Sequence, residues 1–267
     1  MATRRRNAKG SSSILGWVIG FVIVFVIASL LGIFKPSDGT STSSPNPGNS
    51  TASPAEPDSP SSNTPVDPNA TTALSVLDTL AVQGKGSGDG YERDLFGSGW
   101  LDTDNNGCDT RNDILARDLD NITLDSDGCT VLTGVLTYDP YTATTINFTR
   151  GRATSSEIQI DHVIPLSLSF KEGAQNWDDE KREAFANDPL NLIAVQGSEN
   201  GSKSDQDASE WLPTSEIYHC DYVARQIAVK AKYSLWVTIS EKNTMSDVLE
   251  TCPNEPIPAS DEVVIPS

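Results

Sequence analysis

The chain has 267 residues and a formal net charge of −18, and 37% of its residues are hydrophobic. This length allows one or two domains with cores of ordinary size. The acidic balance excludes a protein that binds nucleic acid through bulk positive charge, because Lys and Arg normally supply that affinity by neutralising phosphates. It leaves room for a nuclease with a local positive site and a metal ion, and it fits a secreted protein that must stay soluble.

The N-terminal region predicts a membrane anchor. Residues 1–13 are basic, and residues 14–34 form an uncharged apolar run that is long enough to cross a bilayer as a helix. Positive charge before this run places the N-terminus in the cytoplasm and the rest outside, as in a single-pass protein of the cell membrane. The alternative is a cleaved signal peptide, which would release a secreted protein. Residues 35–72 are rich in Ser, Thr, Pro, Asn and Gly and predict a disordered linker.

The folded domain is predicted to span 73–252, with a flexible acidic tail at 253–267. Hydrophobic spacing, caps and turn residues predict, in chain order, helices at 73–82 and 112–119, a hairpin of 129–137 and 144–148, a strand at 157–160, a charged helix at 171–185, an apolar strand at 191–195, a helix or turn at 199–209 and a helix at 216–239. Helices predominate over few short strands, so the predicted fold class is α+β.

The four cysteines lie outside the predicted membrane span, which favours two disulfides formed in an oxidising compartment. Of the three possible pairings, Cys108–Cys129 and Cys220–Cys252 are favoured because each joins neighbouring segments. Zinc binding is the alternative use of four cysteines, and the absence of a Cys-x-x-Cys pair weighs against it.

The segment EIQIDHVIPLS at 157–167 contains the residues best suited to catalysis. Its alternating strand ends at Asp161 and His162. A histidine beside a carboxylate suits a general base that deprotonates water near neutral pH, and a carboxylate suits Mg²⁺. The alternative is a capping Asp next to a packed His at a turn.

Two later segments favour the catalytic interpretation of Asp161 and His162. These are NDPLNLIAV at 187–195, which contains Asn191, and SENGSKSD at 198–205, which contains Asn200. A strand, a turn, a strand and a helix that carry His, Asn and Asn in this order resemble the ββα-metal core of HNH endonucleases. Further segments resemble the secreted actinobacterial branch related to the GmrSD type of restriction nuclease: GCDTRNDILARDL, GVLTYDPYT, IDHVIPLS, REAFANDPLNL and the run from Asn200 to WLP at 211–213.

This resemblance implies an α+β domain with a ββα-metal core, additional helices and a hairpin. It implies that His162 is the general base, that Asp161 and Asn200 hold the metal, and that Asn191 holds the loop between the strands and thereby orients His162. An amide oxygen is a harder ligand than imidazole, so Asn200 favours Mg²⁺ over zinc. The implied reaction is hydrolysis of phosphodiester bonds in DNA, with RNA less favoured, by a monomeric catalytic domain.

Two basic residues are candidates for holding a substrate phosphate. Lys203 lies three residues after Asn200, about one helical turn along a similar face, and Arg111 lies in the family-like CDTRND segment. The alternatives are an ordinary surface lysine and an arginine that pairs with a neighbouring acid such as Asp109.

Two other functions remain open. The acidic composition also fits a non-catalytic surface module that keeps the HNH frame and binds DNA or glycan. The spacing of acidic and amide side chains over 102–113 resembles a calcium loop, with Asp113 in place of the usual final Glu. The alternative for this stretch is an Asp- and Asn-rich turn beside a disulfide.

Overall fold

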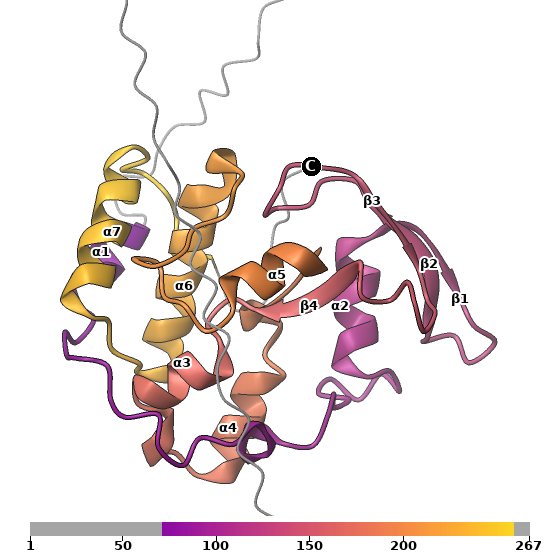
Figure 1. Ribbon diagram of the computed structural model, residues 1–267, viewed down its shortest axis with the longest axis horizontal. Coiled ribbons are helices and arrows are strands. Elements are labelled where there is room, and N and C mark those ends of the chain that lie inside the picture. Colours follow the sequence, from indigo (N-terminus) through magenta and orange to yellow (C-terminus); the bar gives the residue numbers. More distant parts are fainter. Residues whose placement is uncertain (1–70, 259–267) are drawn as a thin grey trace, which may run out of the picture. The chain divides into compact units, whose positions relative to one another are not determined.

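The structure of the protein is a computed structural model that describes residues 71–258 (Figure 1). The basic segment 1–13, the membrane span predicted at 14–34 and all but the end of the predicted linker lie outside these residues. Within 71–258, no helix is long and apolar enough to cross a membrane. The packed chain continues past residue 252, because the backbone N–H of Ala73 donates to the carbonyl of Glu255 at 2.8 Å.

The centre of the domain is a two-stranded antiparallel sheet followed directly by a helix. Strand β4 (Ile158–His162) pairs with β5 (Leu192–Gln196), and helix α5 (Gly197–Lys203) begins at the next residue and lies against β4 (Figure 1). This junction requires a glycine: a Cβ atom on Gly197 would lie 2.0 Å from the backbone oxygen of Ser156. The two predicted strands are therefore confirmed as partners in one sheet, and β4 extends through His162.

A second sheet of three antiparallel strands contains β1 (Asp120–Leu124), β2 (Val131–Leu136) and β3 (Ile146–Thr149) in that order. Strands β2 and β3 confirm the predicted hairpin. Strand β1 was not predicted, because it is short, mostly exposed and has apolar residues only at Ile122 and Leu124. Helix α2 (Thr110–Asp118) links the two sheets: its residue Asp118 accepts a hydrogen bond at 2.7 Å from the backbone N–H of Ala194 in β5.

The prediction of one helix at 171–185 was wrong. Three short elements occupy this region: α3 (Leu166–Lys171), the 3₁₀ turn η2 (Ala174–Asn176) and α4 (Asp179–Ala186). Gly173 has a φ of 138°, which interrupts the helical backbone, and the Asp178 side chain caps the new helix by accepting from the N–H of Lys181. A charged helical pattern cannot reveal such a break, since spacing alone does not report backbone conformation.

The helix predicted at 216–239 is also divided. The turn η4 (Glu216–Tyr218) leads into α6 (His219–Tyr233), which ends where Ser234 adopts a left-handed conformation. A capping box formed by Thr238 and Glu241 then starts α7 (Ile239–Glu250), which the sequence did not predict. Helix α1 (Ala73–Leu77), shorter than predicted, shares a hydrophobic core with α6 and α7.

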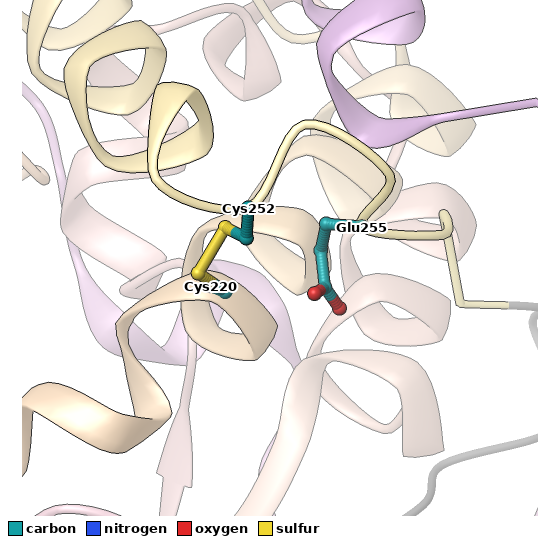
Figure 2. A group of neighbouring side chains, drawn as sticks. All are labelled: Cys220, Cys252 and Glu255. Carbon is teal, nitrogen blue, oxygen red and sulfur yellow. A yellow bond between two sulfur atoms is a disulfide. The ribbon is translucent and has the colours of Figure 1, made fainter. Parts of the chain in front are cut away.

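Both favoured disulfides are present. Cys108–Cys129 joins the segment before α2 to the segment before β2, and Cys220–Cys252 joins the start of α6 to the residue after the C-cap of α7. Figure 2 shows the second bridge with the carboxylate of Glu255 nearby. Cysteine binds a metal as a thiolate, so sulfurs joined in a disulfide make no thiolate site here. The prediction of two disulfides is therefore confirmed over the alternative of zinc binding by the four cysteines.

Candidate active site

The end of strand β4 presents two adjacent side chains to opposite faces. Successive side chains of a strand point to opposite sides, and the partners of Asp161 and His162 follow this rule. Asp161 contacts Tyr141 and the α5 residue Lys203, whereas His162 contacts Trp100 and the end of α4. The two predicted catalytic residues therefore lie side by side in the chain but in different surroundings.

Asp161 is a buried carboxylate with two partners. The Tyr141 hydroxyl donates to its Oδ2 at 2.6 Å, and the Lys203 ammonium lies 3.1 Å from Oδ1 and 3.0 Å from Oδ2. Burial and the negative charge of Asp161 raise the pKa of Tyr141 well above its ordinary value, so this hydroxyl stays a donor. The carboxylate is thus held in one orientation by a hydrogen bond and an ion pair.

Lys203 is fully buried, and its ammonium also donates to the backbone oxygen of His162 at 2.9 Å. Burial lowers its pKa even though Asp161 opposes this effect. In this arrangement the ammonium faces Asp161 and the backbone of β4 rather than the surface, and the contact of Lys203 with a substrate phosphate stays a prediction. Helical spacing placed Lys203 near Asn200 but could not show that the side chain turns inward to Asp161.

Asn200 lies partly buried on α5, where its Nδ2 donates to Oε1 of Gln159 at 2.9 Å. This bond leaves the amide oxygen of Asn200 as an acceptor. Gln159 and Asp161 are two residues apart in β4 and share one face of the strand, so Asn200 lies on the Asp161 side. Among the described residues, no hydrogen bond joins Asn200 to Asp161 itself.

His162 is held as a neutral imidazole. Its Nε2 lies 2.9 Å from the carbonyl oxygen of Ala186, and because a carbonyl can only accept, Nε2 carries the proton. The Nδ1 atom is then the basic nitrogen. Burial lowers the pKa of His162 to about 3, with smaller contributions from the positive charges of Arg93 and Lys203. The ring is therefore uncharged throughout the neutral range.

His162 forms one wall of a small pocket. The Trp100 ring stacks on the imidazole with centroids 5.8 Å apart and an interplanar angle of 9°. The cavity of about 210 Å³ lies between these rings and the 3₁₀ turn η1 (Arg93–Phe96). It is also lined by Gly97, Ser98, Gly99, Leu166 and Ala186. His162 is only 8% exposed, and it is one of the residues that line this cavity.

Asn191, at the end of the 3₁₀ turn η3 (Pro189–Asn191), braces the loop that follows His162. Its Oδ1 accepts from the N–H of Ile164 at 2.8 Å, its Nδ2 donates to the oxygen of Ile164 at 3.3 Å, and its backbone oxygen accepts from Val163 at 2.8 Å. These bonds fix the chain direction directly after the imidazole. The catalytic importance of Asn191 stays a prediction.

Arg111 lies apart from this cluster, half-buried on α2. Burial and the charge of Arg150 lower its pKa, and Asp109 opposes this effect. Arg111 does not line the pocket beside His162. Its contact with a substrate phosphate stays a prediction.

The calcium-like loop folds on itself. Side-chain oxygens of Asp102 and Asp104 accept from the backbone N–H of Asn106 at 3.1 Å, and the Asn106 amide donates to Asp104 at 3.0 Å and to Asp113 at 3.1 Å. Such bonds are typical of an Asx-rich turn. Calcium binding by this loop stays untested.

Sequence reasoning missed three residues that shape the site: Tyr141, Trp100 and Arg93. Tyr141 lies in the turn TYDPYT, where two aromatic residues flank Asp-Pro, an unusual composition for an exposed turn. Trp100 and Arg93 belong to RDLFGSGW, which has no periodicity. In this segment, the presence of Phe96 and Trp100 without regular spacing could have indicated a functional loop, because large aromatic residues are uncommon in loops that only connect elements.

Comparisons with known proteins agree with the predicted resemblance. Residues 109–248 match the model of the family "GmrSD restriction endonucleases, C-terminal domain". The chain is also 39% identical over 187 residues to an "Uncharacterized secreted protein" of Arthroderma benhamiae, with 69% of this chain and 87% of the relative covered. No solved structure matches the chain. The GmrSD relationship is confirmed, whereas an actinobacterial branch is not shown. The chain belongs to the family of GmrSD restriction endonuclease C-terminal domains, which indicates a nuclease-like function.

Proposed function

We propose that this chain is an HNH-type, metal-dependent endonuclease that hydrolyses phosphodiester bonds of DNA. One observation carries the proposal: a neutral histidine lines a pocket at the end of a strand and follows, in the chain, a positioned carboxylate that points to the opposite face, in a chain of a restriction-endonuclease family. The order of β4, β5 and α5 is the order expected for a ββα-metal core.

His162 acts as the general base. Its Nδ1 takes the proton from the attacking water, while the Ala186 carbonyl holds the Nε2–H and stabilises the imidazolium that forms. A pKa of about 3 makes the free imidazole a weak base. A phosphate bound in the pocket brings negative charge to the ring and raises this pKa, so His162 becomes a stronger base when substrate is present.

Asp161 and Asn200 are the proposed ligands of Mg²⁺. A carboxylate and an amide oxygen are hard donors of the kind that Mg²⁺ prefers, and few protein ligands suffice because Mg²⁺ keeps several waters. When bound, Mg²⁺ supplies positive charge against the negative charge that grows on the phosphoryl and leaving oxygens. Lys203 pairs with Asp161, so a Mg²⁺ ion at this carboxylate would compete with its ammonium.

The enzyme acts outside the cytoplasmic membrane as a monomeric catalytic domain. Three observations support an external location: two disulfides, the apolar run at 14–34 with basic residues before it, and the word "secreted" in the name of the relative. Retention of the run anchors the domain to the membrane, and cleavage releases it. Immunodetection of the native chain in membrane and medium fractions separates the two.

The test uses the purified full-length chain with plasmid DNA and with labelled RNA. DNA cleavage requires Mg²⁺ and stops with EDTA. His162→Ala reduces the rate about 10²–10⁴-fold, the range typical of a lost general base. The matched control is His219→Ala, because His219, the other histidine of the chain, bonds the carbonyl of Pro213 away from the site. Equal loss in both variants contradicts the assignment of His162, and faster cleavage of RNA than DNA overturns the preferred substrate.

A non-catalytic binding module is the second candidate, and a specific observation favours it. Asp161 already has a buried counter-cation in Lys203, and His162 is largely buried, as in a frame that no longer turns over substrate. Tight binding of DNA without cleavage in Mg²⁺, Mn²⁺, Ca²⁺ or Zn²⁺ would establish this function instead.

A further inference from the structure

The segment that closes the pocket beside His162 lies outside the region matched by the family model, which begins at residue 109. This segment contains the 3₁₀ turn η1 and the loop 97–100, and it approaches His162 through the stacked ring of Trp100. It therefore adds chemistry to the site that the family relationship does not assign.

Arg93 is the cation of this segment. Its side chain is exposed and lines the pocket, and no ion pair or hydrogen bond occupies it within residues 71–258. Arg93 and His162 line the same pocket. In a chain with a net charge of −18, an arginine left without an acidic partner next to a candidate catalytic base indicates an anionic ligand.

The loop after η1 lines the same pocket and has backbone hydrogen-bond donors without a partner among the described residues. Gly97 has a φ of 93°, a left-handed conformation that turns the chain back over the pocket. The backbone N–H groups of Ser98, Gly99 and Trp100 make no hydrogen bond to any other described residue. Successive unpaired N–H groups in a turned loop form a concave site that attracts anions.

We propose that Arg93 and the loop 97–100 form a binding site for a nucleic-acid phosphate next to the phosphodiester that His162 faces. This inference rests on the proposed nuclease function and deepens it by assigning a substrate contact. The guanidinium forms paired hydrogen bonds to phosphate oxygens, and the loop N–H groups complete the contact. The nucleic-acid strand is thereby positioned so that one phosphodiester lies at Nδ1 of His162.

Acidic groups nearby limit where the phosphate can lie. Asp94 lines the same pocket, and an adjoining hollow on its other side is lined by Asp94, Asp179, Glu180 and Glu183. These carboxylates repel a phosphodiester, so the nucleic-acid strand must enter on the side of Arg93 and the loop 97–100. Removing the charge of Asp94 therefore strengthens binding.

The test measures binding separately from cleavage. A fluorescein-labelled DNA duplex is titrated with the full-length chain in EDTA at several salt concentrations, and anisotropy gives Kd. Arg93→Ala raises Kd about tenfold and reduces the slope of log K against log salt by about 0.9, the value for one lost phosphate contact. Asp94→Asn lowers Kd about two- to fivefold. The matched control is Arg152→Ala, which removes an exposed arginine that does not line the pocket and changes Kd by less than about twofold.

The outcomes separate this inference from the proposed function. If the wild-type chain cleaves DNA and Arg93→Ala binds and cleaves like the wild type, the phosphate site is overturned and the nuclease stands. If the wild-type chain does not cleave but binds DNA in an Arg93-dependent manner, the phosphate site stands and the nuclease fails. Equal effects of Arg93→Ala and Arg152→Ala mean diffuse electrostatic attraction, which overturns the site.

Discussion

Two fully buried lysines in the described part of the chain differ in the charges around them. Lys203 in the candidate site faces one carboxylate, Asp161, and burial lowers its pKa. Lys230 in α6 contacts Glu172 and Glu241 and donates to the carbonyl of Trp236 at 3.2 Å, and its pKa is raised because the two acids outweigh its burial. The surroundings of Lys230 therefore favour its charged form, whereas those of Lys203 do not.

This difference separates a structural cluster from a functional one. Lys230 ties together the ends of α3 and α6 and the first turn of α7, and its partners are fully buried. Lys203 pairs with Asp161, which is also a proposed metal ligand, and burial lowers the pKa of the Lys203 ammonium. The comparison predicts that a metal ion replaces the ammonium more readily in the Lys203 pair than in the Lys230 cluster, because the surroundings of Lys230 favour its charged form.

The largest effect is expected for Lys230→Met. The substitution leaves Glu172 and Glu241 buried without their cation, and breaking a buried pair in this way costs about 3–5 kcal/mol. Denaturant unfolding of the full-length chain with its disulfides intact measures this loss. The double variant with Glu241→Gln should recover part of it. A loss under about 1 kcal/mol would show that the cluster does not hold these helices together.

Lys203→Met should destabilise the chain less, by about 1–3 kcal/mol, since it leaves one buried carboxylate rather than two without a cation and Asp161 keeps the Tyr141 hydrogen bond. Mg²⁺ should restore part of this loss by taking the place of the ammonium, and it should restore less in Lys230→Met, where the carboxylates of Glu172 and Glu241 are fully buried. Thermal unfolding with and without Mg²⁺ measures both. Identical responses of the two variants to Mg²⁺ would remove the distinction between the two regions.

The Lys230 cluster should also make stability depend on pH. Burial raises the pKa of Glu172 to about 8 from an ordinary 4.5, against the opposing charge of Lys230. Because the folded state binds this proton more tightly, its stabilising contribution is complete below about pH 4.5 and is lost as pH rises through about 8. Unfolding free energies from pH 6.5 to 9 should therefore fall, and Glu172→Gln should flatten the curve. An unchanged slope in this variant would assign the titration to another group.

The smallest effect concerns the pH dependence of cleavage. The folded pKa of about 3 keeps His162 neutral, so kcat/KM should show no loss from its protonation as pH falls from 7 to 5. The profile in Mg²⁺ measures this, with a stability curve as control for acid unfolding. An ionisation near pH 6.5 that disappears in His162→Gln would contradict the buried environment of this ring.

Local patterns explain which parts of the fold were predictable. The strands around Asp161 and Leu192, the hairpin of β2 and β3, and helix α2 follow apolar alternation, caps and turn residues that lie within a few positions of each other. The divisions between α3 and α4 and between α6 and α7 were missed, because they depend on positive φ angles at Gly173 and Ser234 that carry little signal in composition.

By itself, the sequence determined the residue types that chemistry requires, the resemblance to the family and the order of strand, strand and helix that brings residues 159–162 close to α5, and it favoured the two disulfide pairs that the structure contains. Only the tertiary structure decided which way the side chains point. Lys203 turns inward to Asp161 rather than outward, and Trp100 and Arg93 reach His162 from a loop some sixty residues earlier. Spacing reports the face of an element but not the partner on the other side, since burial and ion pairing depend on segments that are distant in sequence.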